Sequence, residues 1–348
     1  MNDLTVAVEN RPSWLGDDHE LPHPPADVPL WSENYLTYTY APAPAVGVYF
    51  HLRRLPDTSG PQPVWDAVTY ISLPDNRFLV SKTFAPLEMQ EPSPTGGRGA
   101  LRIGGLEWRC EQPFARWTMR LRGAARLVTG EELWAGPLQD GQHVGIDVEL
   151  DVASVTPPWD YGTDELQSAF AKRHYAQHHH ATGTLRYGDQ TIAIAGSGLR
   201  DHSWGPRDLS KIGHTTWIHG RVPETGRAFC ITYIPERAPY PKLDDPKVAD
   251  ASAVYHTETI DPPVGETITE ALEDCEFKLK MPDGRWSTVR CQVITTLPMH
   301  FVAPSEFVVG AAAGRPGETH DYLPSFARIE WDGRVGYGYS ERCVRRSP

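Results

Sequence analysis

The sequence predicts an all-β protein made of two β-barrel or β-sandwich domains in tandem. Thirty-two prolines and thirty glycines interrupt its 348 residues at short intervals, with short runs of alternating polarity between them. Alternation with a period of two is typical of a strand that buries one face, and Pro and Gly favour the turns that connect such strands. Helical periodicity is scarce, so a sandwich or barrel is favoured over a mixed fold.

The pattern also predicts the order of the elements along the chain. Residues 1–28 are rich in proline and lack periodicity, which predicts an irregular N-terminal arm. A proline-rich break at residues 156–162 lies near the midpoint, so we expect an N-terminal β-domain at 29–160 and a C-terminal β-domain at 161–348. Alternating runs that predict strands include residues 35–40, 46–52, 117–122 and 145–152, and the main helical pattern covers 164–176.

Composition limits the classes of partner. The formal net charge of −12 would repel nucleic acid and anionic membranes, and no apolar run is long enough to span a membrane as a helix. We therefore expect a hydrophobic small molecule of little charge as the ligand, and leave a homodimer open. The five scattered cysteines and a polar N-terminus without a signal-peptide pattern predict reduced thiols in a cytoplasmic protein.

Residues 196–208 are the most informative segment. They place Arg200, Asp201, His202 and Trp204 among glycines, directly after an apolar run. In a pocket the acid and the imidazole can exchange protons, the arginine can hold charge, and the indole can cover an apolar ligand or a cation. On a regular strand Asp201 and His202 would point to opposite faces, whereas a bulge at the flanking glycines would turn both inward.

We take Asp201 and His202 as candidate catalytic residues, and Arg200 and Trp204 as candidate substrate-binding residues. In the alternative interpretation Asp201 caps a turn, Arg200 pairs with a surface acid, and Trp204 belongs to the core.

Residues 217–234 predict a strand, a turn and a second strand. Trp217 and His219 share one face of the first strand, and Tyr233 lies on the second. A face that carries Trp and His is either exposed to solvent or lines a polar cavity. Trp217 is therefore a further candidate for substrate binding, and His219 and Tyr233 become candidates through a family resemblance of the chain.

The Asp-His-Ser-Trp-Gly string at 201–205 and the Gly-Tyr-Gly-Tyr-Ser-Glu string at 336–341 resemble motifs of the AttH-like and carotenoid 1,2-hydratase superfamily, which includes kievitone hydratases. The resemblance implies two lipocalin-like β-domains and a barrel interior lined by the strands at 217–234. Hydratases of this family are thought to use a Tyr and an Asp on the second of those strands. Tyr233 matches the Tyr, but no acid lies between residues 228 and 234, so the acid would be Asp201 or Glu341.

The histidine run at 174–180 is the main candidate for a metal site. His178 and His180 would share a face of a strand, and His-x-His is a known ligand spacing. No nearby motif supplies a third ligand, so we expect surface histidines and no metal. The sequence also lacks phosphate-binding and dinucleotide-binding glycine motifs, and we expect no cofactor.

These observations predict a cofactor-independent lyase, that is a hydratase, a dehydratase, or a cation-type cyclase or isomerase. A carboxylic acid in an apolar pocket would protonate a terpenoid, polyketide-like or phenolic substrate, with Asp201, His202 and Glu341 as catalytic candidates. The alternatives are a non-catalytic lipocalin-like carrier of a hydrophobic molecule and a histidine-dependent metal enzyme. Loss of Asp201 would leave a carrier intact, and metal content would identify the metal enzyme.

Overall fold

The computed structural model of the chain describes residues 10–56, 63–90, 99–161, 171–208, 212–236, 242–304 and 306–346. Within these ranges nearly all regular structure is β, so the predicted all-β class is confirmed. The short helices are η1 (Asp17–Glu20), α2 (Gly130–Trp134) and α4 (Ile268–Leu272). Most of the helix expected at 164–176 lies outside the described residues, and its last four residues are strand. No helix in the described part of the chain is both long and apolar enough to cross a membrane.

The first antiparallel sheet closes on itself. Strand β9 pairs with both β8 and β11, which completes the ring β11-β12-β1-β2-β3-β4-β8-β9. Short strands β5 to β7 extend from β8, and β10 extends from β11. The strands are β1 (Trp31–Ala41), β2 (Val46–Arg54), β3 (Val64–Ser72), β4 (Arg77–Pro86), β5 (Glu88–Gln90), β6 (Gly99–Ile103), β7 (Leu106–Gln112), β8 (Arg116–Thr129), β9 (His143–Ser154), β10 (Trp159–Asp160), β11 (Arg173–Tyr187) and β12 (Gln190–Pro206).

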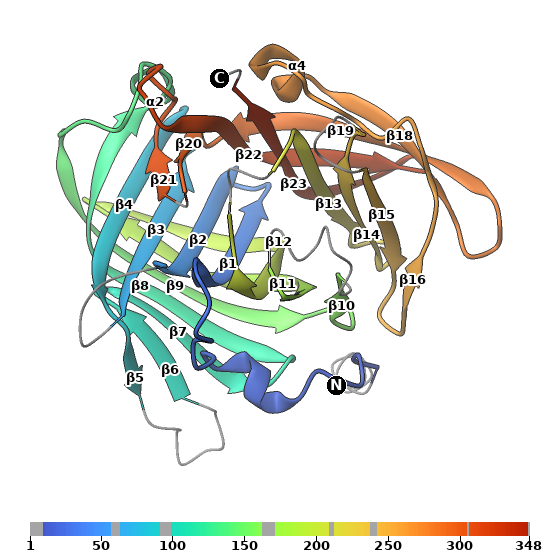
Figure 1. The fold of residues 1–348 in the computed structure, drawn as a ribbon, viewed down its shortest axis with the longest axis horizontal. Coiled ribbons are helices and arrows are strands. Elements are labelled where there is room, and N and C mark those ends of the chain that lie inside the picture. The colour runs from blue at the N-terminus through green and yellow to red at the C-terminus, as the bar shows by residue number, and fades with distance from the viewer. Residues whose placement is uncertain are drawn as a thin grey trace.

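The second sheet is also antiparallel, with the order β16-β15-β14-β13-β23-β22-β19-β18-β17. A short hairpin of β20 and β21 joins it beside β22. Its strands are β13 (Thr215–Val222), β14 (Arg227–Ile234), β15 (Leu243–Ala249), β16 (Val254–His256), β17 (Thr259–Ile260), β18 (Cys275–Lys280), β19 (Trp286–Thr296), β20 (Met299–Val302), β21 (Glu306–Val309), β22 (Glu318–Trp331) and β23 (Arg334–Arg345). Figure 1 shows this sheet above the first one, with the N-terminal arm at the bottom.

The change from one sheet to the other falls between Pro206 and Thr215. The domain boundary expected at 160/161 stays a prediction, and the sheet change follows it because β11 and β12 return to the first sheet and close its ring. The strand that carries the Asp-His-Ser-Trp-Gly string is therefore part of the first sheet, where it pairs with β1.

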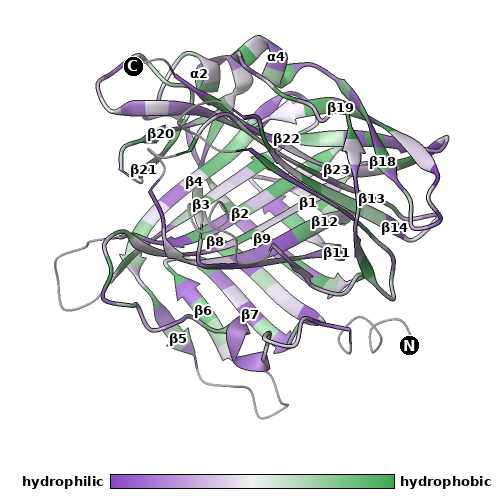
Figure 2. Cartoon of the chain, turned by 45° about the vertical axis from the view of Figure 1, so that its right-hand side comes forward, coloured by the Kyte–Doolittle hydropathy of each residue, from purple (hydrophilic) through white to green (hydrophobic). Residues whose placement is uncertain are grey.

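Hydrophobic and hydrophilic residues alternate along many of the strands (Figure 2). This alternation produces separate apolar layers. Along β1, Tyr35 points into the first barrel, whereas Leu36 and Tyr38 point toward the second sheet. A layer between the sheets combines these residues with Trp217 and Tyr339 of the second sheet. β1 is buried along its whole length because it has apolar neighbours on both faces.

Candidate active site

A cavity of about 110 Å³ lies between the two sheets. Strands β1, β2, β11 and β12 contribute residues from one side, and β13, β14, β20, β21, β22 and β23 from the other. Most of the wall surface is apolar, but five of the eighteen lining residues are His, Asp, Glu or Arg. The lining residues are Asn34, Leu36, Tyr49, His51, Tyr161, His174, Asp201, Ser203, Arg207, Thr215, Thr216, Trp217, Thr232, Phe301, Phe307, Tyr322, Glu341 and Cys343.

Glu341 is the acid most altered by this cavity. Burial raises the pKa of its carboxyl group to about 8, an effect that the charge of Asp201 reinforces. The hydroxyls of Tyr322 and Tyr339 both donate hydrogen bonds to its Oε2 atom, the latter over 3.1 Å, which limits the rise. At neutral pH Glu341 is therefore a neutral carboxylic acid, with Oε1 as the oxygen that can carry and donate the proton.

Asp201 contributes a second carboxyl group to the same cavity. Its Oδ2 atom lies 2.7 Å from Nε2 of His174, on the neighbouring strand β11. Tyr161 stacks on the His174 ring at 4.0 Å, and its hydroxyl accepts a hydrogen bond of 2.9 Å from Nε1 of Trp217. The stack and the hydrogen bond fix the imidazole in place, so that Asp201 and His174 can exchange a proton across a short contact.

Arg207 is the cation beside these acids. Its guanidinium donates to the hydroxyl of Ser203 over 2.7 Å, and burial lowers its pKa to about 10. Arg207 therefore belongs to the wall of the cavity.

Strand alternation separates Asp201 from His202. β12 and β1 pair in continuous register with Asp201 opposite Leu36 and His202 opposite Tyr35. Directly opposed residues share a face of a sheet, so Asp201 faces the second sheet whereas His202 faces the barrel interior. No bulge turns them the same way, and the ring of Tyr35 stacks on His202 at 3.9 Å.

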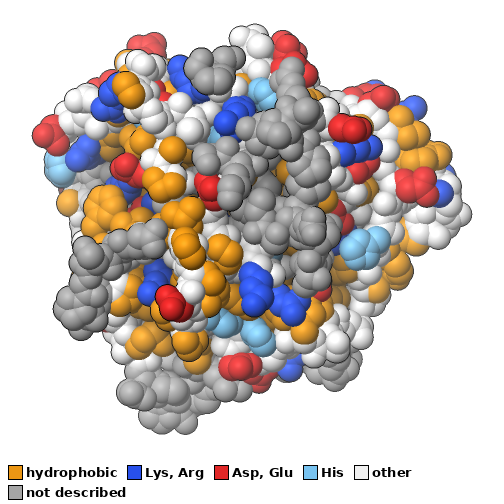
Figure 3. Space-filling model, in the orientation of Figure 1, with side chains coloured by type: hydrophobic (Ala, Val, Ile, Leu, Met, Phe, Trp, Pro, Cys, Tyr) orange, Lys and Arg blue, Asp and Glu red, His pale blue; other side chains and the backbone are white. Residues whose placement is uncertain are grey.

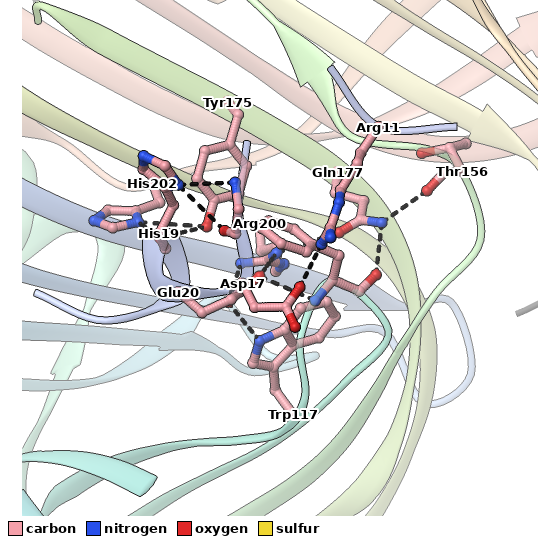
Figure 4. A network of polar contacts seen from close by, with 12 residues as sticks. Arg11, Asp17, His19, Glu20, Trp117, Thr156, Tyr175, Gln177, Arg200 and His202 are labelled. Atoms are coloured by element: carbon pink, nitrogen blue, oxygen red, sulfur yellow. Dashed lines mark hydrogen bonds and ion pairs between the residues drawn. The ribbon is translucent and has the colours of Figure 1, made fainter. Parts of the chain in front are cut away.

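Arg200 and Trp204 lie on the same face as His202, away from the cavity. The buried guanidinium of Arg200 pairs with Glu20 of the N-terminal arm at 2.5 Å and lies 3.7 Å from the centre of the Trp117 ring. Glu20 also accepts a hydrogen bond of 2.9 Å from Trp117. Trp204 packs against Trp14, Leu15 and other apolar residues around the arm. Figure 4 shows how this network connects the arm to Arg200 and His202.

The second sheet divides its candidate residues in a similar way. Trp217 lies directly opposite both Glu341 and Thr232, and all three line the cavity. His219 is fully buried beside it, stacked on Tyr339 and in contact with the hydroxyl of Tyr38, but it does not line the cavity. Tyr233 packs against the apolar layer on the other face of this sheet.

Several residues of the cavity were missed by the sequence interpretation. Tyr161, His174 and Tyr322 come from strands or loops far apart in the chain, and only the pairing of the strands brings them together. The two-residue period offered a partial signal, because His174 and Ser203 are directly opposed and share the face of Asp201.

Comparison with known proteins supports the architecture. The family model of a domain of unknown function, DUF7064, matches residues 16–345. No curated protein matches the sequence. Among solved structures, the AttH-type protein of Nitrosomonas europaea is similar with a TM-score of 0.56 and 11% identity, covering 92% of this chain and 98% of that one. CghA gives 0.56 at 12% identity with 94% and 96% coverage, and kievitone hydratase from Nectria haematococca gives 0.50 at 10% with 98% and 97%. The expected superfamily resemblance is thereby confirmed at the level of fold.

Proposed function

The chain belongs to the DUF7064 family, and we propose that it is an acid–base lyase whose substrate binds between its two sheets. The observation that carries this proposal is Glu341, a half-buried residue whose carboxyl group has a pKa near 8 in an aromatic cavity. Such a group is a proton donor at neutral pH. One neighbour in fold is named as a hydratase, which supports the same class of reaction.

In the proposed reaction Glu341 gives its proton to a carbon of a C=C bond, or to a hydroxyl that leaves as water. With an alkene, the electron pair of the double bond forms the new C–H bond, and a cation develops on the neighbouring carbon. With an alcohol, the C–O bond breaks, its electron pair leaves with the water molecule, and the cation develops on the carbon that carried the hydroxyl. The faces of Trp217, Phe301 and Phe307 surround the cavity and can stabilise that charge. No cofactor takes part in this step.

Asp201 and His174 complete the cycle on the other side of the cavity. In hydration a water molecule attacks the cation and transfers a proton to the Asp201–His174 pair, which returns it to Glu341 through solvent. In dehydration, or in a cyclisation that ends in an alkene, the pair removes a proton from the carbon next to the cation. Their contact of 2.7 Å makes them suitable as a unit that accepts a proton.

The lining favours a compact, uncharged ring system. A volume of about 110 Å³ is small for a ligand pocket, so a phenolic or small terpenoid or polyketide-like molecule fits the proposal better than a long chain. The half-buried Arg207 can hold a carbonyl or phenol oxygen of that substrate. On the face drawn in Figure 3, the visible acidic and basic side chains are interspersed, with no broad basic area that would attract a polyanion.

Deuterium incorporation tests the proposal even while the substrate and product are unidentified. Mass spectrometry of molecules that copurify with the protein would guide a panel of phenolic and terpenoid alkenes and alcohols, which is then incubated with the enzyme in D₂O. We expect a carbon-bound deuterium, or gain or loss of water, in one compound class. Glu341→Gln should abolish the change, and the exposed control His180→Ala should keep it. Tight binding by the wild-type protein without any change across the panel would favour the carrier.

A further inference from the structure

A second group of ionisable side chains lies inside the first barrel, on the face of β12 that points away from the cavity. It combines His23 from the N-terminal arm, Glu33 from β1 and His202 from β12. One nitrogen or oxygen atom of each residue lies within 4.8 Å of the others. We propose that these three residues bind a divalent transition-metal ion, with Zn²⁺ as the best match, and that the ion links the arm to the barrel.

The contacts converge on a single carboxylate oxygen. Oε1 of Glu33 lies 2.7 Å from Nδ1 of His23 and 2.9 Å from Nε2 of His202. Two imidazole nitrogens and one carboxylate form a common ligand set for zinc, which takes water in the remaining position of a three-residue site. Without a cation, each of these two nitrogens must carry a proton toward the same oxygen.

The hydrogen bonds around His202 orient it as a ligand. Its Nδ1 lies 2.8 Å from the backbone carbonyl of His19 (Figure 4), and a carbonyl can only accept, so this nitrogen carries the hydrogen. In the neutral ring the lone pair is then on Nε2, the atom that faces Glu33. A metal-binding histidine commonly donates its other N–H to a backbone carbonyl in this way, which fixes the tautomer and raises ligand basicity.

Both imidazoles are also held by aromatic stacking. Tyr35 stacks on His202 at 3.9 Å, and Trp204 stacks on His23 at 3.8 Å. The backbone N–H of His23 donates to both oxygens of Glu33, each over 3.0 Å. The side chains of Glu33 and His202 are completely buried, whereas that of His23 is 19% exposed, which gives an ion and its water a route from solvent.

The proposed metal site differs from the His178 and His180 pair that the sequence analysis considered. His178 is buried, contrary to the surface position expected for it, whereas His180 is exposed. His180 therefore provides a control histidine that lies outside the proposed ligand set. The proposal is independent of the lyase reaction, because the three ligands do not line the cavity of Glu341.

Metal binding by the full chain, purified without a histidine tag, tests the proposal. After chelation, the protein would be titrated with Zn²⁺, its metal content measured by mass spectrometry after dialysis, and its thermal unfolding followed with and without zinc. We expect one zinc ion per chain and a rise in Tm of about 4 °C or more at saturating zinc. Cobalt substituted for zinc should show the visible absorption of a site with nitrogen and oxygen ligands.

His23→Ala and Glu33→Gln should each weaken zinc binding by at least about tenfold, whereas His180→Ala should bind as the wild type does. His23 is partly exposed, so its alanine variant provides the test even where Glu33→Gln does not fold. The proposal would be overturned by binding of less than about 0.1 zinc ion per chain, or by equal zinc affinity in the wild type and in folded His23→Ala. The three side chains would then form a hydrogen-bonded cluster only.

Discussion

The two faces of β12 contrast sharply although their residues alternate along one strand. On the barrel face Arg200, His202 and Trp204 contact partners from the arm and from neighbouring strands. On the other face Asp201 and Ser203 border a cavity and contact polar groups that a substrate can reach. The comparison teaches that one short sequence motif can both stabilise the barrel and line the cavity. Neighbouring residues of a strand point to opposite faces, so one lies in the barrel interior and the next faces the space between the sheets.

The largest expected effect is on the cavity side. Glu341→Gln keeps the size of the side chain and the hydrogen bonds from Tyr322 and Tyr339 to an oxygen, but removes the acidic proton. We expect turnover to fall by roughly 10²–10⁴-fold, with a Tm close to the wild-type value. The measurement is kcat for a substrate found in the D₂O panel, beside a thermal melt. Normal turnover in the folded variant would exclude Glu341 as the acid.

The corresponding change on the barrel side should affect folding instead. Glu20→Gln leaves the buried Arg200 without its carboxylate, and breaking a buried pair from one side costs roughly 3–5 kcal/mol. Denaturant unfolding would measure the loss, and activity at low temperature should persist in the folded fraction. A stability unchanged within about 1 kcal/mol would show that the arm does not depend on this pair. A selective loss of turnover at full stability would instead connect the arm to the cavity.

Asp201→Asn and His202→Asn compare direct neighbours in the chain. We expect Asp201→Asn to reduce turnover by about 10²-fold, because the amide cannot accept the proton that His174 relays. His202→Asn should mainly lower Tm, because it removes a stacked and hydrogen-bonded ring from the barrel. Turnover and Tm of the two purified variants distinguish these effects. If both variants lose turnover equally at unchanged Tm, the assignment of Asp201 to catalysis and of His202 to stability is wrong.

The dependence of activity on pH follows from the raised pKa of Glu341. The acid must be protonated to act, so kcat/KM should fall about tenfold per pH unit above pH 8. The stability effect has the same direction: the folded pKa of about 8 exceeds the ordinary value of 4.5, so this contribution is complete below pH 4.5 and is lost as the pH rises toward 8. A pH–rate profile with no decrease between pH 8 and 9.5 would argue against this assignment.

The smallest effect concerns the aromatic wall. If Trp217 stabilises a cation, Trp217→Leu should lower kcat by about two- to thirtyfold and Trp217→Phe by less, since a cation–π contact contributes roughly 0.5–2 kcal/mol. The same pair of changes at Trp204, on the barrel side, should alter stability and leave kcat of the folded protein unchanged. Equal kcat for Phe and Leu at position 217 would limit that residue to packing.

The fold was predictable because strand alternation is a local property, and runs such as 35–40 and 46–52 became strands β1 and β2. Register and closure are not local. The proline-rich break at 156–162 is a natural place for a domain boundary. However, β11 and β12, which follow this break, return to the first sheet and complete its ring. The position of the sheet change therefore depended on long-range pairing, which no local pattern contains.

The candidate site was predictable only in part, for the same reason. Alternation shows that Asp201 and His202 diverge, but it does not show which of them meets a cavity. Glu341 was suggested by the resemblance of its strand, whereas the proximity of His174 and Tyr322 required the register of several strands. Glu20 and His23 come from an arm without periodicity, so no sequence pattern connected them with β12.

The wall that β1 and β12 share has a consequence for how this protein could change over generations. Side chains on its cavity face contact little of the barrel interior, so substitutions at Leu36 or Ser203 can alter the shape offered to a ligand without changing the contacts inside the barrel. Alternate positions on the same strands complete the barrel and tolerate little variation. New substrate preferences could thus arise by drift at every second residue, while the intervening residues keep the scaffold constant.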